Sequence, residues 1–137
     1  MGRPVRVLIV DDNPDDVDLL RLSLGRGCNC VVDAVYSGAD AVRVLREAPP
    51  ETRAQLVLLD VNMPGMTGRD VLIALRADPR TAAIPVLALS SSDDPSDVDA
   101  LYRLGASCYL LKPTGLPEFR LLAERVDQFW FQMVLLA

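Results

Sequence analysis

The sequence contains no histidine and only three cysteines, Cys28, Cys30 and Cys108. Cys28 and Cys30 could supply half of a thiolate metal site, but without histidine the remaining ligands are hard to find. An odd number of cysteines without secretory features instead indicates reduced thiols, as in a cytoplasmic protein. The composition therefore disfavours both a zinc site and a disulfide-bonded secreted domain.

Long apolar runs and an excess of positive charge are also missing. No uninterrupted apolar stretch is long enough to cross a bilayer, and acidic residues follow the first apolar run too soon for a signal peptide. The formal net charge is −5 and the isoelectric point is about 4.6, which disfavours nucleic acid as a direct partner. We therefore expect a cytoplasmic protein that binds neither membranes nor nucleic acid.

The chain does contain enough apolar residues for one packed domain, since half of its 137 residues are hydrophobic. Short apolar runs alternate five times with segments that have helix caps and amphipathic spacing. The predicted strands cover residues 5–10, 30–35, 56–59, 86–90 and 108–113, and everything after about residue 116 is predicted to be helical. Continuous apolar strands that alternate with helices indicate an α/β fold, a doubly wound five-stranded parallel sheet with helices on both faces.

Polar side chains stand at the ends of four of these five strands. They are Asp11 and Asp12 after the first strand, Asp60 at the third, Ser90 at the fourth and Lys112 at the fifth. The carboxyl ends of parallel strands meet at one edge of the sheet, where such folds bind their ligands. Each residue alone could cap a helix, start a turn or be a solvated charge. Their joint placement at one edge instead predicts a functional site.

Three carboxylates at one edge repel one another unless a cation lies between them. Oxygen ligands without nearby histidine or cysteine favour a hard ion, Mg²⁺ or Mn²⁺. The hydroxyl of Ser90 and the ammonium of Lys112, opposite such an ion, could hold the oxygens of a phosphoryl group. We therefore expect Asp60 to be a nucleophile that accepts a phosphoryl group in a metal-dependent reaction.

Four short motifs extend this interpretation: "VDD" at 10–12, "LLDVNMPGMTG" at 58–68, "ALSS" at 88–91 and "YLLKP" at 109–113. In this order and at these intervals, the sequence from about Val5 to Val126 resembles the receiver domain of two-component response regulators. The resemblance implies a flavodoxin-like fold for a domain at residues 1–127. It also implies that the chain is no enzyme beyond catalysing the phosphorylation and dephosphorylation of its own aspartate.

The resemblance implies roles for residues that match the family motifs. Asp60 would be the phospho-acceptor, and Lys112 and Ser90 would contact the phosphoryl group. Tyr109 would be the switch aromatic residue that turns inward when Ser90 moves. The peptide bond between Lys112 and Pro113 would be cis.

The resemblance also implies a set of metal ligands. Asp12 would bind Mg²⁺ directly, together with Asp60, and Asp11 would bind it mainly through water. Asn62 would contribute its backbone carbonyl. Mn²⁺ could replace Mg²⁺ at this site.

The last ten residues, 128–137, are predicted to be an apolar helical extension of the receiver domain. Leu122, Val126, Phe129 and Met133 would form one stripe that could dock on the sheet, which leaves other apolar side chains uncovered. A helix that is apolar nearly all round is buried by something. We therefore expect a homodimer, twofold symmetric, rather than intramolecular packing alone. Its contacts would come from Phe129, Trp130, Phe131, Met133, Val134 and Leu135.

The apolar tail and the early "DDNPDD" at 11–16 resemble single-domain receivers that partner bacterial phytochrome histidine kinases. This finer resemblance implies a single-domain regulator of a phosphorelay that signals by protein contacts. Its phosphodonor would be a sensor histidine kinase, of the bacteriophytochrome kind, or a small phosphodonor, because the chain has no histidine of its own.

Three other functions stay open. The chain could be a relay intermediate that passes the phosphoryl group to a downstream phosphotransfer protein. It could be a metal-dependent phosphatase that forms an aspartyl-phosphate, although Asn62 stands where such enzymes need a second carboxylate. It could also be an interaction module that never accepts phosphate, which the complete set of polar residues disfavours.

Overall fold

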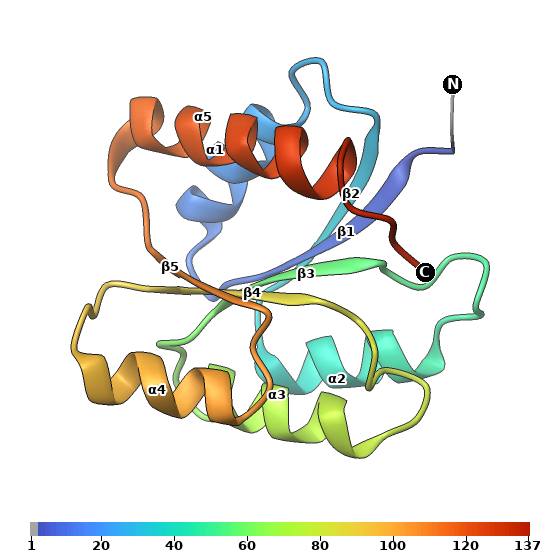
Figure 1. Ribbon diagram of the computed structural model, residues 1–137, viewed down its shortest axis with the longest axis vertical. Coiled ribbons are helices and arrows are strands. Elements are labelled where there is room, and N and C mark those ends of the chain that lie inside the picture. The colour runs from blue at the N-terminus through green and yellow to red at the C-terminus, as the bar shows by residue number, and fades with distance from the viewer. Residues whose placement is uncertain (1–2) are drawn as a thin grey trace.

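The computed structural model describes residues 3–137 and confirms the α/β fold (Figure 1). One parallel sheet has the strand order β2-β1-β3-β4-β5. The strands are β1 (Val5–Val10), β2 (Cys30–Val35), β3 (Leu56–Asp60), β4 (Val86–Ser90) and β5 (Cys108–Leu111). The helices between and after them are α1 (Pro14–Leu24), α2 (Gly38–Glu47), α3 (Gly68–Ala77), α4 (Pro95–Arg103) and α5 (Gly115–Val126).

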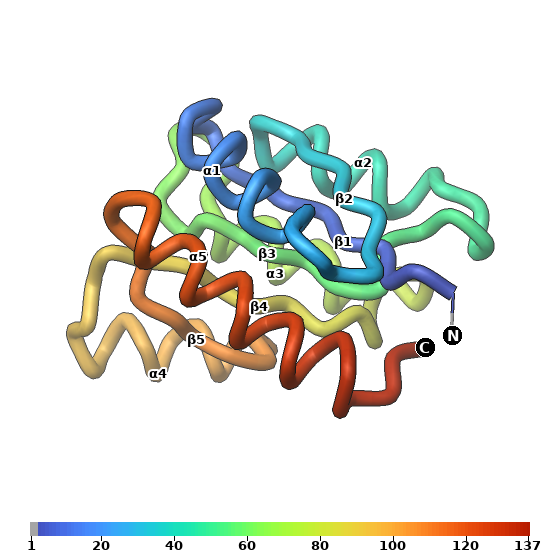
Figure 2. Tube along the Cα trace, turned by 90° about the horizontal axis from the view of Figure 1, so that it is seen from above, coloured from blue at the N-terminus to red at the C-terminus, as the bar shows by residue number. Residues whose placement is uncertain are grey.

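The helices form a layer on each face of the sheet. Helices α1 and α5 lie side by side on one face, and α2, α3 and α4 cover the other (Figures 1 and 2). Residues of the central strand β3 alternate between the two layers: Leu56 and Leu58 pack towards α1 and α5, whereas Val57 and Leu59 pack towards α2, α3 and α4. All five residues of β3 are therefore buried, which explains why this strand reads as a continuous apolar run.

Local signals in the sequence set where the helices begin. The Asn13 side chain caps α1 by accepting hydrogen bonds from the backbone N–H groups of Asp15 and Asp16. Helix α3 starts at Gly68 because a Cβ atom there would lie 2.6 Å from the Cα atom of Val61. Glycine thus lets α3 begin directly against the end of β3, as the "TG" step in the sequence suggests.

The chain end corrects one prediction. A short π-helix, η1 (Asp127–Phe131), follows α5, and residues 132–137 are not helical. The stripe predicted through Phe129 and Met133 is wrong, since these side chains are 51% and 72% exposed, and Trp130 and Phe131 pack on the apolar core instead. The reason is the wider i→i+5 turn, which places residues 130 and 131 one turn after Val126.

Beyond η1 the chain turns back towards the amino ends of the strands. The side-chain amide of Gln55, just before β3, donates a hydrogen bond of 3.0 Å to the carbonyl oxygen of Ala137. The start of β1 and the carboxyl end of the chain consequently lie at the same edge of the sheet (Figure 1). Within residues 3–137, none of the helices has the length and apolar character needed to span a bilayer.

The three cysteines are partly exposed free thiols. Burial, together with the charge of Asp127, raises the pKa of Cys28 to about 12, and burial also raises the pKa of Cys30 and of Cys108. Thiols with a raised pKa stay protonated near neutral pH, so they are poor nucleophiles and poor metal ligands.

The packing of β3 gives a stability prediction. Leu58→Ala removes a fully buried side chain from the central strand, so the free energy of unfolding should fall by about 3 kcal/mol in urea denaturation. The matched control is Leu22→Ala on α1, at a side chain that is 56% exposed, where we expect a change below about 0.5 kcal/mol. Equal effects of the two substitutions would contradict this account of the core.

Candidate functional site

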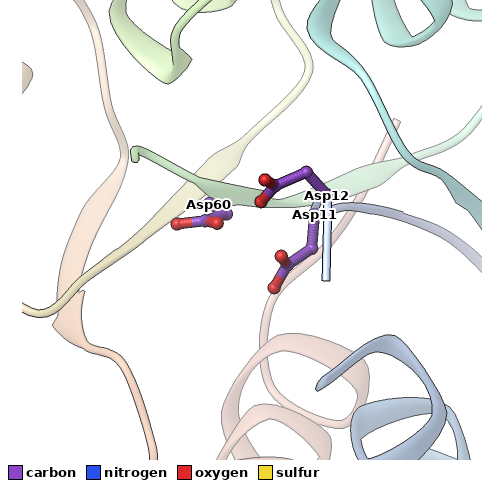
Figure 3. A group of neighbouring side chains, drawn as sticks. All are labelled: Asp11, Asp12 and Asp60. Atoms are coloured by element: carbon purple, nitrogen blue, oxygen red, sulfur yellow. The ribbon is translucent and has the colours of Figure 1, made fainter. Parts of the chain in front are cut away.

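The fold brings the predicted polar residues together at the carboxyl edge of the sheet. Asp11 and Asp12 directly follow β1, and Asp60 ends the neighbouring strand β3. Chain connections leave β1 and β3 towards opposite faces, so this is the point where ligands bind in such sheets. Figure 3 shows the carboxylates of Asp11 and Asp12 beside that of Asp60. Asp11 and Asp60 are buried, whereas Asp12 is exposed to solvent.

Lys112, directly after β5, supplies the positive charge of the site. Its ammonium nitrogen lies 3.0 Å from Asp11 Oδ2, 3.0 Å from Asp16 Oδ2 and 3.3 Å from Asp60 Oδ2. Burial alone would lower the pKa of Lys112, but the hydrogen bonds and charges of these carboxylates outweigh it and hold the pKa above its usual value. The ammonium therefore stays charged and offsets part of the repulsion among the acids.

The carboxyl group of Asp60 has an unusual environment. Burial raises the pKa of Asp60 to about 6, with a further contribution from the charge of Asp11. Two contacts act in the opposite direction: the Asn62 backbone N–H donates a 3.1 Å hydrogen bond to Asp60 Oδ1, and Lys112 binds Oδ2. Asp60 is thus ionised at neutral pH and poorly solvated, which suits a nucleophilic oxygen.

Ser90 lies at the end of β4, next to Asp60, and is buried. Its hydroxyl oxygen accepts hydrogen bonds from the backbone N–H of Ser92 at 3.2 Å and from the side-chain amide of Asn62 at 3.4 Å. The Ser90 hydroxyl proton is therefore free to turn towards an oxygen bound at Asp60.

Tyr109 on β5 is half-buried and reaches the loop after β4. Its hydroxyl donates a 2.6 Å hydrogen bond to the carbonyl oxygen of Ser92. Tyr109, Ser90 and Ser92 also line a cavity of about 160 Å³ beside the acidic residues. A shift of Ser90 towards Asp60 would move the loop to which Tyr109 is bonded, so the two residues are mechanically connected.

The acidic residues fit a hard divalent cation. One carboxylate oxygen from each of Asp11, Asp12 and Asp60 can be chosen so that all lie within 4.8 Å of one another. These are oxygen ligands without imidazole or thiolate, the set that Mg²⁺ and Mn²⁺ prefer. Asn62 lies beside Asp60, because its backbone N–H donates a hydrogen bond to Asp60 Oδ1. That the Asn62 backbone carbonyl binds the metal remains a prediction.

Two residues of this site were not predicted from the sequence. In the sequence Asp16 is an acidic residue of the first turn of α1, which by itself indicates only a favourable interaction with the helix dipole, and Ser92 carries no motif. The signal for Asp16 was its place in the first turn of a helix that starts directly after Asp11 and Asp12, at the same edge of the sheet. For Ser92 the sequence holds no signal, because its partner Tyr109 is far away along the chain.

The cis bond expected between Lys112 and Pro113 is wrong, since no peptide bond among residues 3–137 is cis. The Lys112 ammonium reaches all three carboxylates with this bond in the trans form. The ordinary trans preference of a bond before proline is therefore compatible with the site.

The chain matches a protein-family model over residues 7–124, that of the response regulator receiver domain. This segment includes every strand of the sheet except the first two residues of β1. It also contains all the polar residues of the site.

Similar proteins cover nearly the whole chain. The response regulator Rcp1 of Synechocystis is 37% identical over 97% of this chain and 93% of its own length. The phosphorylated cyanobacterial phytochrome response regulator RcpA has a TM-score of 0.88 at 30% identity, over 97% of this chain and 98% of that one. The Mn²⁺-bound form of Rcp1 has a TM-score of 0.85 at 30% identity, over 98% and 99%.

Other relatives are longer proteins. A probable cyclic di-GMP phosphodiesterase of Vibrio cholerae is 36% identical over 88% of this chain, but the chain spans only 25% of that relative. The match to that relative covers 120 residues. The chain therefore belongs to the family of response regulator receiver domains.

Proposed function

We propose that the chain accepts a phosphoryl group on Asp60 from a histidine kinase and signals through protein contacts. The observation that carries this proposal is the position of the Asp60 carboxylate, which lies among Asp11, Asp12 and the Lys112 ammonium. An ionised oxygen, acidic ligands for a cation and a fixed positive charge are the parts that phosphoryl transfer to an aspartate needs.

In the proposed reaction an Asp60 carboxylate oxygen attacks phosphorus. The bond from phosphorus to the donor nitrogen of phosphohistidine, or to the carboxyl oxygen of acetyl phosphate, breaks, and the donor leaves with the electron pair. Lys112 and the Ser90 hydroxyl then donate hydrogen bonds to phosphoryl oxygens. The chain catalyses this step and the later hydrolysis only for its own Asp60, so it is not an enzyme for other substrates.

We propose Mg²⁺ as the metal, held by Asp11, Asp12, Asp60 and the backbone carbonyl of Asn62. A bound divalent ion would offset the charge of the carboxylates and of the incoming phosphoryl group. The Mn²⁺-bound structure of the similar protein Rcp1 supports a divalent cation at this kind of site. Mn²⁺ is therefore expected to substitute for Mg²⁺.

Phosphorylation would act through the loop after β4. Ser90 would move towards the phosphoryl group, and this shift would stabilise the inward position of Tyr109, which here already packs against the core and donates a hydrogen bond to the Ser92 carbonyl. The face formed by α4, β5 and α5 would change as a result, where Tyr102 and Leu111 expose 48% and 59% of their surface. Such a change shifts the population between two conformations, and a binding partner senses it.

The kinase partner that we propose is a bacteriophytochrome or a related sensor kinase. RcpA is a phytochrome response regulator, and its fold matches this chain nearly end to end. The chain also spans 93% of the length of the response regulator Rcp1, which supports a regulator of the same kind. The direct downstream target would be an effector protein. We expect neither nucleic acid nor a membrane as a partner, and we expect the protein to act in the cytoplasm.

We also propose that the chain is a homodimer, with a receiver domain at 1–127 and a dimer contact at 128–137. The exposed apolar side chains of the tail support this, because such residues usually mark an interface when they gather on one surface. They are Phe129, Met133 and Leu135, which are 51%, 72% and 99% exposed. Three other tail residues are partly buried within the chain: Trp130, Phe131 and Val134. We therefore expect them to make a smaller part of the dimer contact than the exposed residues.

A second candidate function is that of a relay intermediate. It uses the same Asp60 chemistry and differs only in the next acceptor, a histidine phosphotransfer protein. The phosphatase alternative has less support, because the side chain of Asn62 donates to Ser90 where an acid/base carboxylate would be needed.

The acceptor role of Asp60 can be tested by labelling. With cognate kinase or acetyl phosphate and Mg²⁺, the unchanged protein should gain one phosphoryl group, detected by intact-protein mass spectrometry. Asp60→Asn should abolish the gain, because an amide is not a nucleophile here, while the circular dichroism spectrum stays the same. Asp33→Asn, at an exposed aspartate on β2, is the matched control and should be labelled normally. Labelling of Asp60→Asn would refute the assignment.

The metal assignment can be tested without any phosphodonor. Asp12→Asn removes one proposed ligand from the surface, so the affinity for Mn²⁺ should fall by about tenfold or more. Electron paramagnetic resonance of free Mn²⁺ measures this affinity directly, and Asp33→Asn again serves as the control. An unchanged affinity in Asp12→Asn would place the cation elsewhere.

The dimer contact can be tested through its exposed side chains, which leaves Trp130 and Phe131 in the core. The double variant Phe129→Glu/Met133→Glu should change a dimer into a monomer in multi-angle light scattering, because two carboxylates cannot be buried in an apolar contact without a large cost. Leu22→Glu/Ile73→Glu, at side chains that are 56% and 51% exposed on α1 and α3, should remain a dimer. An unchanged mass of the tail variant would exclude the tail as the contact.

A further inference from the structure

Asp16 is an ion-pair partner of Lys112 that is not among the predicted metal ligands. It stands in the first turn of α1, and its Oδ2 atom is 3.0 Å from the Lys112 nitrogen, shorter than the 3.3 Å from that nitrogen to Asp60. The pair is largely shielded from water, since the side chains of Lys112 and Asp16 are 19% and 23% exposed. An ion pair in such a place is stronger than one on the open surface.

The Lys112 ammonium has three N–H donors, and three carboxylates surround it. The ammonium is therefore shared among three carboxylates before a phosphoryl group arrives. A phosphoryl oxygen on Asp60 has to compete with these carboxylates for a hydrogen bond from Lys112. Asp11 and Asp60 also belong to the cation site, whereas Asp16 is outside the group of Asp11, Asp12 and Asp60.

We propose that Asp16 is a positioning residue that competes with the phosphoryl group for the Lys112 ammonium and so weakens the binding of that group at Asp60. The proposal rests on the proposed role of Asp60 as phospho-acceptor. It adds Asp16 as a residue that lowers the affinity of the site for a phosphoryl group on Asp60.

The charges around Lys112 agree with this competition. Asp16 Oδ2 lies as close to the ammonium nitrogen as Asp11 Oδ2 does, at 3.0 Å, and closer than Asp60 Oδ2 at 3.3 Å. One of the two shortest contacts of the ammonium is thus made by a residue outside the reacting group. Loss of that partner would leave the ammonium on the side of Asp11 and Asp60, where the phosphoryl oxygens arrive.

The test measures the binding of beryllofluoride, a phosphoryl mimic, to the full chain with saturating Mg²⁺. An NMR titration that follows the amide signals of Ser90 and Tyr109 gives the Kd. Asp16→Asn keeps the size of the side chain and removes its charge, so the mimic should bind about threefold to tenfold more tightly. Asp16→Glu, which keeps the charge, should restore the Kd of the unchanged protein to within about twofold.

Asp15→Asn is the matched control, because Asp15 shares the first turn of α1 and is exposed to solvent. Asp15→Asn removes the same charge from the same helix end. Because solvent screens an exposed charge that does not contact Lys112, we expect the Kd of beryllofluoride to change by less than about twofold. The same gain in Asp15→Asn as in Asp16→Asn would overturn the proposal.

A double-mutant cycle with Lys112→Met tests whether Asp16 acts through Lys112. In the Lys112→Met background, Asp16→Asn should change the Kd by less than about twofold, because the residue for which it competes is gone. A gain that persists there would show a field effect and refute the competition, as would an unchanged Kd in the single variant Asp16→Asn.

The outcome is separable from that of the proposed function. If the mimic fails to bind the unchanged protein, or binds Asp60→Asn equally well, the acceptor role of Asp60 is wrong. If the mimic binds in an Asp60-dependent way and Asp16→Asn has no effect, the acceptor role stands and only the role of Asp16 is wrong.

Discussion

The contact between one ammonium and three carboxylates holds the functional edge of this protein together. Asp11 and Asp60 are buried side by side, and like charges at such a place would drive one of them to its neutral form. Lys112 supplies the compensating charge from β5, two strands away from β3. The exposed Asp12 completes a group of three carboxylates that is compatible with the proposed divalent cation. In that proposal two sources of positive charge, Lys112 and the cation, balance the carboxylates.

This balance depends on the order of the strands. Strands β1 and β3 are neighbours although β2 lies between them in the chain, which brings Asp11 and Asp12 next to Asp60. Strands β4 and β5 continue the sheet and place Ser90 and Lys112 along the same edge. Because the helices start directly after the strands, α1 adds Asp16 to the group. The opposite edge holds the amino ends of the strands and the tail, so the two ends of the molecule can serve different contacts.

Much of this could be predicted from the sequence, because the signals are local. Apolar runs of strand length and helix caps such as Asn13 each depend on neighbours in the chain. The four motifs of the acidic edge were found for the same reason. The tail was predicted less well, because its apolar pattern is compatible with both an α-helix and a π-helix. Packing of Trp130 and Phe131 against the core distinguishes the two, and this packing cannot be read from the sequence.

The parallel sheet and the set of polar residues at its edge follow from the sequence, since strand ends and parallel direction are enough to group these residues. How the residues share their charges depends on the folded arrangement. It gave Lys112 a third partner in Asp16, it tied Tyr109 to Ser92, and it turned Trp130 and Phe131 inward while Phe129 stayed exposed. These outcomes depend on distances between segments far apart in the chain, and no local pattern of residues encodes such distances.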